Sequence, residues 1–89
     1  MNNYSFNTFI LFMYSLINML DDTEIINVYS KKHKNLVLTY SNRKNSDSKR
    51  IDFLSNCLVA FENEDIIVIS RNNKNIFEYS IISDKLKRV

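Results

Sequence analysis

The 89-residue chain contains no glycine and no proline, and this absence restricts how its backbone can reverse direction. Tight turns between strands often need a residue with positive φ, and glycine is the usual choice there. Asparagine and aspartate are tolerated next best, and the chain holds 13 asparagines. The segment 71–75, Arg-Asn-Asn-Lys-Asn, is the plainest example. We therefore expect asparagine, aspartate and lysine to form the turns.

The rest of the composition indicates one globular domain, residues 1–89. The length suits a single domain, and a hydrophobic content of 45% is too high for a disordered chain. Asn, Ile, Lys, Ser, Tyr and Phe are abundant, whereas there is one alanine. The abundant types are mostly written with A/T-rich codons, which indicates the AT-rich genome of a low-GC bacterium, its phages or plasmids, or a virus.

Residues 4–20 are predicted to form a helix. At 100° per residue, most of the large apolar side chains fall on one broad half, although Tyr4, Leu11 and Tyr14 break the pattern. The acidic residues that follow disfavour the carboxyl end of a helix, so the helix should stop by Leu20 or Asp21. The apolar stretch 9–20 is shorter than the roughly 20 residues of a membrane span, so we expect a soluble protein without a membrane partner. A membrane-surface or subunit role for the helix 4–20 is the weaker alternative.

Strand patterns then repeat along the chain. The predicted strands are 24–30, 35–41, 50–61, 66–71 and 75–81. In the third, Ile51 and Phe53 share one face and Cys57 and Val59 share another, which requires a bulge near Ser55. Residues 84–89 fit a short helix or a frayed strand. Because parallel neighbours need connections of about a dozen residues or more, the short connections here predict antiparallel pairing.

The predicted fold is therefore α+β: one N-terminal helix packed on an antiparallel sheet of about five strands, arranged as a meander. The strand 66–71 is apolar on both faces, so it should lie centrally, with the helix on one side. Two arrangements would cover the other side. The sheet could curl into a small barrel, or a second subunit could form a homodimer.

No catalytic, cofactor or metal site is predicted. Phosphate-binding loops of the familiar kinds depend on glycine. One cysteine and one histidine cannot complete a structural zinc site or a disulfide framework. The acidic groups at 21–24 and 62–65 lack the spacing of a calcium loop. We expect solvated acidic turns, a solvated turn histidine at His33 and core packing for Cys57, and hence a protein that is not an enzyme.

Charge placement gives one candidate binding patch. In a meander, the loops 42–50 and 71–75 share one end of the sheet, so their cations could bind an anion or a partner. The candidate residues are Arg43, Lys44, Lys49, Arg50, Arg71 and Lys74. The acidic junction at 21–24 should enter at the same end and neutralise part of the patch. The opposite end should be mixed, with Lys31, Lys32, Lys34, Glu62, Glu64 and Asp65.

Two functions follow from these observations. The first is a small binding protein from a phage, virus or mobile element that docks onto a larger host protein or ribonucleoprotein in the host cytoplasm. Inhibitors of host defence, anti-CRISPR proteins among them, are often of this size and lack enzymatic motifs. The alternative is binding of nucleic acid or a nucleotide ligand through the basic end, although a net charge of +2 is small for that class.

Overall fold

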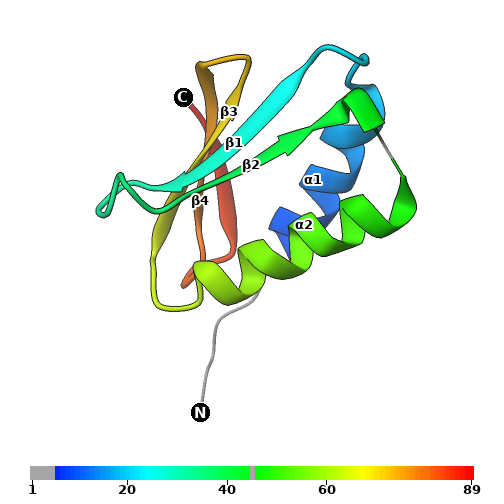
Figure 1. Cartoon of the computed structure of the whole chain (residues 1–89). Helices are drawn as coiled ribbons and strands as arrows, with labels where there is room; N and C mark the ends of the chain where they lie inside the picture. The colour runs from blue at the N-terminus through cyan, green and yellow to red at the C-terminus, as the bar shows by residue number, and fades with distance from the viewer. Residues whose placement is uncertain (1–5, 45) are drawn as a thin grey trace.

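The computed structural model describes residues 6–44 and 46–89, without the side chain of Lys44. In chain order the elements are α1 (Asn7–Met19), β1 (Ile25–Ser30), β2 (Val37–Ser41), the 3-10 turn η1 (Asn42–Lys44), α2 (Asp47–Ala60), β3 (Ile66–Arg71), β4 (Lys74–Ser80) and β5 (Lys85–Arg88). The strands pair in the order β2-β1-β3-β4-β5, and every pair is antiparallel (Figure 1). The predicted α+β fold is confirmed, with an open sheet in place of a barrel.

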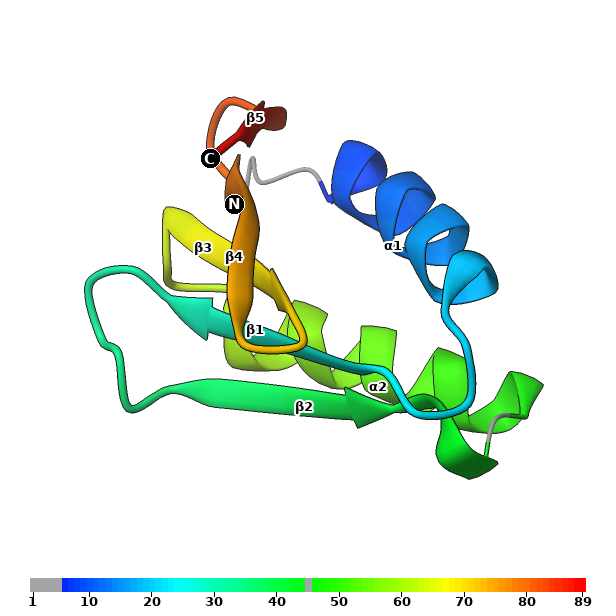
Figure 2. The ribbon, with the colours of Figure 1, turned by 90° about the horizontal axis from the view of Figure 1, so that it is seen from above.

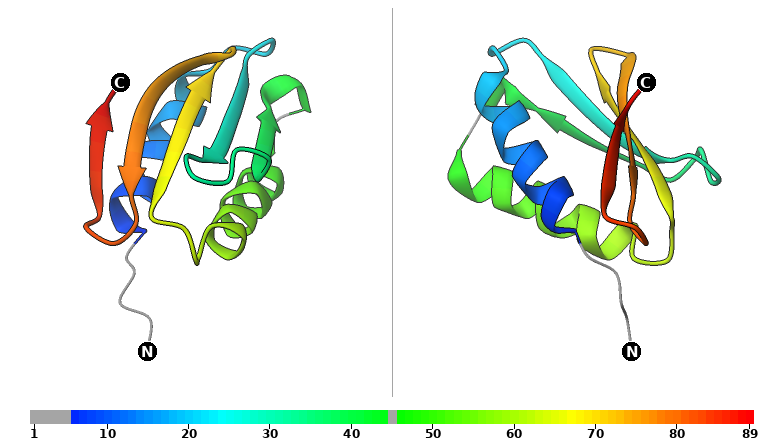
Figure 3. Two further views of the ribbon diagram at one scale, coloured as in Figure 1. Left: turned by 90° about the vertical axis from the view of Figure 1, so that its left-hand side faces the viewer. Right: turned by 180° about the vertical axis from the view of Figure 1, so that it is seen from behind.

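Both helices cover one face of the sheet and leave the other face bare (Figures 2 and 3). Helix α1 packs over β4, where the rings of Phe12 and Phe77 are 4.7 Å apart. Helix α2 packs beside β2, where the rings of Tyr40 and Phe53 are 5.4 Å apart. The core lies between these two layers, where side chains of the strands that face the helices, such as Ile26, Val28, Ile67, Ile69 and Tyr79, are buried.

Helix α1 forms because its apolar residues recur with a helical period. Phe9, Met13, Leu16 and Ile17 are buried against the sheet, as expected from spacings of three and four. The helix ends at Met19, since the next residue is extended. This agrees with the predicted stop, whereas the predicted start at Tyr4 falls outside the described residues.

The predicted strand 50–61 is wrong, because this segment is helix α2. Its N-cap is Ser46, whose side-chain oxygen accepts a hydrogen bond from the Lys49 N–H at 3.3 Å. Asp47 lies in the first turn, where a carboxylate complements the helix dipole. The buried residues are Phe53, Leu54, Cys57 and, just past the helix, Phe61. Their spacing fits a period of 3.6 and needs no bulge.

The turns confirm the role of asparagine and aspartate. Among the described residues, positive φ occurs at Asn72 (52°), Asn73 (67°) and Asp84 (52°). The two asparagines form the two-residue connection between β3 and β4, where both central positions need positive φ. At Asp84, the carboxylate Oδ1 accepts hydrogen bonds from the Tyr79 hydroxyl at 2.5 Å and the Thr8 N–H at 3.1 Å. This contact ties α1 to the β4–β5 turn.

The strand predicted to lie centrally is β3, and it occupies the middle position in the strand order of the sheet. Ile67 and Ile69 are fully buried beneath the helices, and Val68 on the opposite face is also buried, at 4% exposed. Within residues 84–89, which the sequence left open between helix and strand, Lys85–Arg88 form β5 at one edge of the sheet. The sheet therefore keeps five strands although one of the predicted strands is a helix.

Candidate functional site

The predicted basic residues lie around one end of the sheet, but an acidic segment enters between them. Ile25 of β1 pairs with Ser41 of β2, and Ile26 pairs with Arg71 of β3. The 3-10 turn η1 and the β3–β4 turn therefore flank the start of β1. The segment 21–24, with three acidic residues, leads into β1 at this point. The basic residues consequently do not form one continuous cationic surface.

Arg71 is paired with Glu24 through two hydrogen bonds. Its Nε donates to Glu24 Oε2 at 2.8 Å, and its Nη2 donates to Oε1 at 2.7 Å. The hydrogen bonds from Arg71, followed by one from the backbone N–H of Asp21, lower the pKa of Glu24 from 4.5 to about 2. The expected neutralisation by the acidic junction is thus confirmed for Arg71.

The other predicted patch residues have separate surroundings. Arg50 Nη1 lies 3.5 Å from Asp47 Oδ1 on the first turns of α2. Arg43 and Lys74 are exposed, and Lys49 borders a hollow described below. The side chain of Lys44 lies outside the described part of the chain. The structure therefore brings no two of these six side chains into one described contact.

A hollow of about 330 Å³ lies between β2 and α2. Tyr40 and Phe53, both more than nine-tenths buried, line its floor. Exposed polar side chains of α2 form its rim: Lys49, Asp52 and Asn56. The hollow runs along the backbone of Thr39 to Ser41, so an apolar floor and a polar rim accompany the edge of the sheet.

The outer edge of β2 carries unpaired backbone groups. The N–H of Ser30 donates to the carbonyl of Leu36 at 3.1 Å, and the β1–β2 register is continuous from there. Since hydrogen-bonded and non-hydrogen-bonded pairs alternate in an antiparallel ladder, Leu38 and Tyr40 bond to β1. The backbone N–H and C=O groups of Val37 and Thr39 and the N–H of Ser41 therefore point outward, and no other strand of the described residues pairs with them.

The two edges of the sheet differ in charge. The outward residues of β2 are Val, Thr and Ser, without charge, proline or bulge. The β5 edge carries Lys85, Lys87 and Arg88, all exposed. Lysine on an edge strand is a common device against pairing with another chain. Only the β2 edge, of these two, is open to an added strand.

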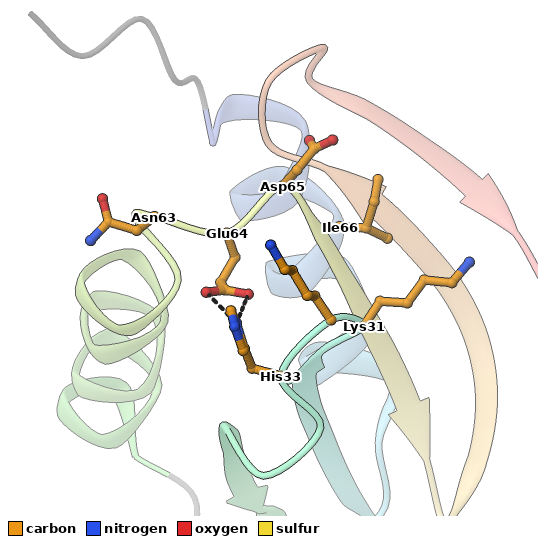
Figure 4. Close-up of a pocket in the computed structure, with 7 residues that line it drawn as sticks. Lys31, His33, Asn63, Glu64, Asp65 and Ile66 are labelled. Atoms are coloured by element: carbon orange, nitrogen blue, oxygen red, sulfur yellow. Dashed lines mark hydrogen bonds and ion pairs between the residues drawn. The ribbon is translucent and has the colours of Figure 1, made fainter.

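A second hollow, of about 380 Å³, lies between the β1–β2 loop and the α2–β3 loop (Figure 4). Its lining residues are Lys31, Lys32, His33, Asn63, Glu64, Asp65 and Ile66. The expected mixture of charges at this end of the sheet is confirmed. His33 Nδ1 lies 3.0 and 3.1 Å from the two carboxylate oxygens of Glu64. The ring is about half exposed, at 55%, whereas the Glu64 side chain is 10% exposed.

Glu64 also accepts a hydrogen bond from the buried Ser30 hydroxyl. This bond, followed by the one to His33, holds the pKa of Glu64 below its ordinary value. Both residues were predicted as solvated turn residues, and the contact between them was missed. The only signal in the sequence was the expected meeting of the two charged loops at one end of the sheet.

A third, shallow hollow of about 420 Å³ lies on the bare face of the sheet. Here the Tyr29 hydroxyl donates to Asn75 Oδ1 at 3.1 Å, and the other lining residues are Asn27, Lys34, Val37, Ser70 and Asn73. Its amide and hydroxyl groups already bond to one another in part, as between Thr39 Oγ1 and Asn27 Oδ1 at 2.6 Å.

Cys57 is fully buried, as predicted, and burial raises the pKa of its thiol to about 12, so it is unreactive at neutral pH. No group of three or more His, Cys, Asp or Glu side chains within residues 6–44 and 46–89 is arranged to hold a metal ion. Neither helix, over the same residues, has the length and apolar run that crossing a bilayer requires.

Comparison with known protein families, curated proteins and solved structures finds none that is similar to this chain.

Proposed function

We propose that the protein is a small non-enzymatic binding protein that docks onto a larger host protein, and that an extended segment of this partner adds to the β2 edge. The observation that carries the proposal is an uncharged strand edge with unpaired backbone groups beside a hollow with an aromatic floor. In strand addition, main-chain hydrogen bonds provide affinity, and pockets beside the edge select alternate side chains. The β2 edge and its hollow offer both.

The surroundings of β2 describe the segment that would bind. An added strand would direct alternate side chains to the helix side of the sheet. There Tyr40 and Phe53 offer an apolar surface, and Lys49 and Asp52 of opposite charge lie beside it. A segment with one apolar side chain flanked by polar or charged ones fits this chemistry.

The β2 strand of a second copy of this chain fits the β2 edge less well than an extended segment of another protein. Antiparallel pairing of two β2 strands would continue the sheet, with both α2 helices on the same side. The rim residues of α2 lie beside the outer edge of β2, so the α2 helices of the two copies would come close to each other. The two copies of Lys49 would also meet as like charges. Formation of a homodimer through β2 would therefore contradict the proposal. The amino-acid composition is typical of an AT-rich genome such as that of a phage, and this origin supports a host protein as the partner.

The alternative function, anion binding at the basic end, has less support. Arg71 is already paired with Glu24, and the acidic segment 21–24 separates the remaining cations. No described contact joins those cations into one site.

The proposal can be tested with peptides selected from a random library displayed on phage. Thr39→Pro removes one outward N–H and leaves the backbone bonds to β1 in place, although it also removes the Thr39 hydroxyl that donates to Asn27 Oδ1. We expect it to weaken a selected peptide about tenfold, because the lost hydrogen bond and altered edge together cost on the order of 1.4 kcal/mol. The matched control is Arg88→Pro on β5. By the register, and with the Val89 N–H bonded to the Ile76 carbonyl, residue 88 also points outward, so peptide affinity should not change.

A second pair of variants avoids any change in the backbone. Asn56→Arg fills the rim of the hollow, whereas Ser55→Arg alters its exposed neighbour outside the hollow. We expect only Asn56→Arg to reduce peptide binding. Equal effects of the two substitutions, or equal effects of the two prolines, would contradict the proposal.

The natural partner can be sought by replacing Asp52 with a photo-crosslinking amino acid and irradiating the cells in which the protein is made. An adduct with a larger protein that disappears with Thr39→Pro is expected. An adduct with a second copy of this chain, or with nucleic acid, would show that another class of partner occupies the edge, and the proposal would be wrong.

A further inference from the structure

We propose that the hollow between the β1–β2 and α2–β3 loops binds a phosphate-type oxyanion through the Lys32 ammonium group and the protonated ring of His33. This site is independent of the proposed peptide edge. It lies beyond the carboxyl end of α2, whereas the hollow beside β2 borders residues 49–56 of that helix.

The two carboxylates in the hollow are already engaged by donors of the protein. Glu64 accepts from the Ser30 hydroxyl and faces His33 Nδ1. Oδ1 of Asp65 accepts from the Ser80 hydroxyl at 2.8 Å and from the Ile82 N–H at 3.3 Å. Figure 4 shows Glu64 directed toward His33 and Asp65 directed away from that pair. Both carboxylates therefore already accept hydrogen bonds from the protein before any ligand binds.

The cations are not all engaged in the same way. Lys31 Nζ lies 3.1 Å from Glu78 Oε2 and points away from the His33–Glu64 pair (Figure 4). Lys32, which lines the hollow, has no hydrogen bond to another described residue. His33 Nε2 also has none, because the contact to Glu64 uses Nδ1. The Lys32 ammonium, whose charge also acts on Glu64, and the His33 ring nitrogen Nε2 can thus still donate hydrogen bonds to a ligand.

The ring of His33 decides when the anion can bind. With Nδ1–H donating to Glu64, a neutral ring presents a lone pair at Nε2, which repels an anion. A protonated ring presents an N–H donor there and a positive charge. The charged groups around the ring are Glu64 and Asp65 of the α2–β3 loop and Lys31, Lys32 and Lys34 of its own loop. Anion binding should therefore take up a proton at His33.

The geometry selects an oxyanion with several acceptor oxygens. A hollow of about 380 Å³ holds a phosphate group with a small attached group. The chain lacks the glycine-rich loops that usually surround phosphate with backbone N–H groups, so the side-chain donors Lys32 and His33 of the β1–β2 loop take this role.

Because the chain has one histidine, the experiment can follow the His33 ring signals by NMR. We would titrate them with pH in inorganic phosphate, in O-phosphoserine and in chloride of equal ionic strength. We expect phosphate and phosphoserine to raise the midpoint of the ring titration and chloride to leave it unchanged. Phosphate affinity should fall as His33 loses its proton, because the proposed binding requires that proton. A stronger effect of phosphoserine would indicate a phosphorylated side chain as the natural ligand, and equal effects the free ion.

Two lysine variants provide the matched control. Lys32→Ala should abolish the effect of phosphate on the midpoint. Lys34→Ala removes a nearby positive charge that lines the shallow hollow on the bare face of the sheet. Phosphate should still raise the midpoint of the ring titration in this variant. An unchanged midpoint in phosphate, or equal losses in the two variants, would overturn the proposal. His33→Gln keeps a polar side chain and provides a second check by calorimetry, in which phosphate binding at pH 6 should be lost.

Discussion

Glu24 is the residue that joins the α1–β1 junction to the β3–β4 turn. Its carboxylate binds the Arg71 guanidinium and the side-chain amide of Asn72. The Asn72 Oδ1 in turn accepts from the Ile25 N–H at 3.0 Å. A turn residue with positive φ is thus held by the same carboxylate that pairs with Arg71.

Replacing Glu24 by glutamine should make stability less dependent on pH. The folded pKa of about 2 lies below the ordinary value of 4.5, so the ionised carboxylate stabilises the fold above pH 4.5 and loses this effect as pH falls toward 2. We expect Glu24→Gln to be less stable than the natural chain at pH 6, with the difference narrowing at pH 3. Glu64 also has a lowered pKa, but it is present in both proteins, so its contribution cancels in the difference between their free energies of unfolding.

Denaturant unfolding at both pH values measures this difference. A gap in the free energy of unfolding that stays constant between pH 6 and pH 3 would show that the ion pair does not carry the effect.

At this scale the sequence was a partial guide. The lack of glycine identified asparagine and aspartate as turn residues, since few other residues tolerate positive φ. Contacts such as Glu24–Arg71 and Glu64–His33 join positions 47 and 31 residues apart, and they depend on strand register. The predicted antiparallel strand order placed the two loops of the second pair at one end of the sheet, without showing which residues meet.

Among the elements, α2 shows how a sequence pattern can mislead. Ile51 and Val59 supported the strand alternation, but both are on the solvent side of a helix, at 51% and 71% exposed. Exposed apolar residues are common on protein surfaces, so they can imitate a second period. The buried residues alone, from Phe53 to Phe61, carry the helical spacing. Helix α1 was predicted correctly because its buried residues Phe9, Met13, Leu16 and Ile17 keep a helical spacing, although Leu11, Tyr14 and Met19 are exposed. Strand β3 was predicted correctly because Ile67, Val68 and Ile69 are all buried.

The N-cap of α2 gives a direct test of this element. Ser46→Ala should destabilise the protein by about 1 kcal/mol, because the N–H of Lys49 loses its acceptor. Ser48→Ala changes an exposed serine within the first turn and should have little effect. Urea unfolding at neutral pH compares the two. Equal destabilisation by both substitutions would argue against a cap at Ser46.

In the whole molecule, β3 is the strand with neighbours on both sides at the centre of the sheet, and β2 is bonded on one side only. Hydrogen exchange should report this arrangement. We expect the slowest amides in β3. Along β2, the amides of Leu38 and Tyr40, bonded to β1, should exchange much more slowly than those of Thr39 and Ser41. Uniform exchange along β2 would contradict the register from which the free edge is inferred.

The unequal borders of the sheet have a consequence for the size of any assembly. The opposite edge of the sheet offers no second uncharged strand, because β5 carries Lys85, Lys87 and Arg88. If a partner segment adds to β2 as proposed, strand addition should not continue past β5, and each copy of this chain should hold one partner segment.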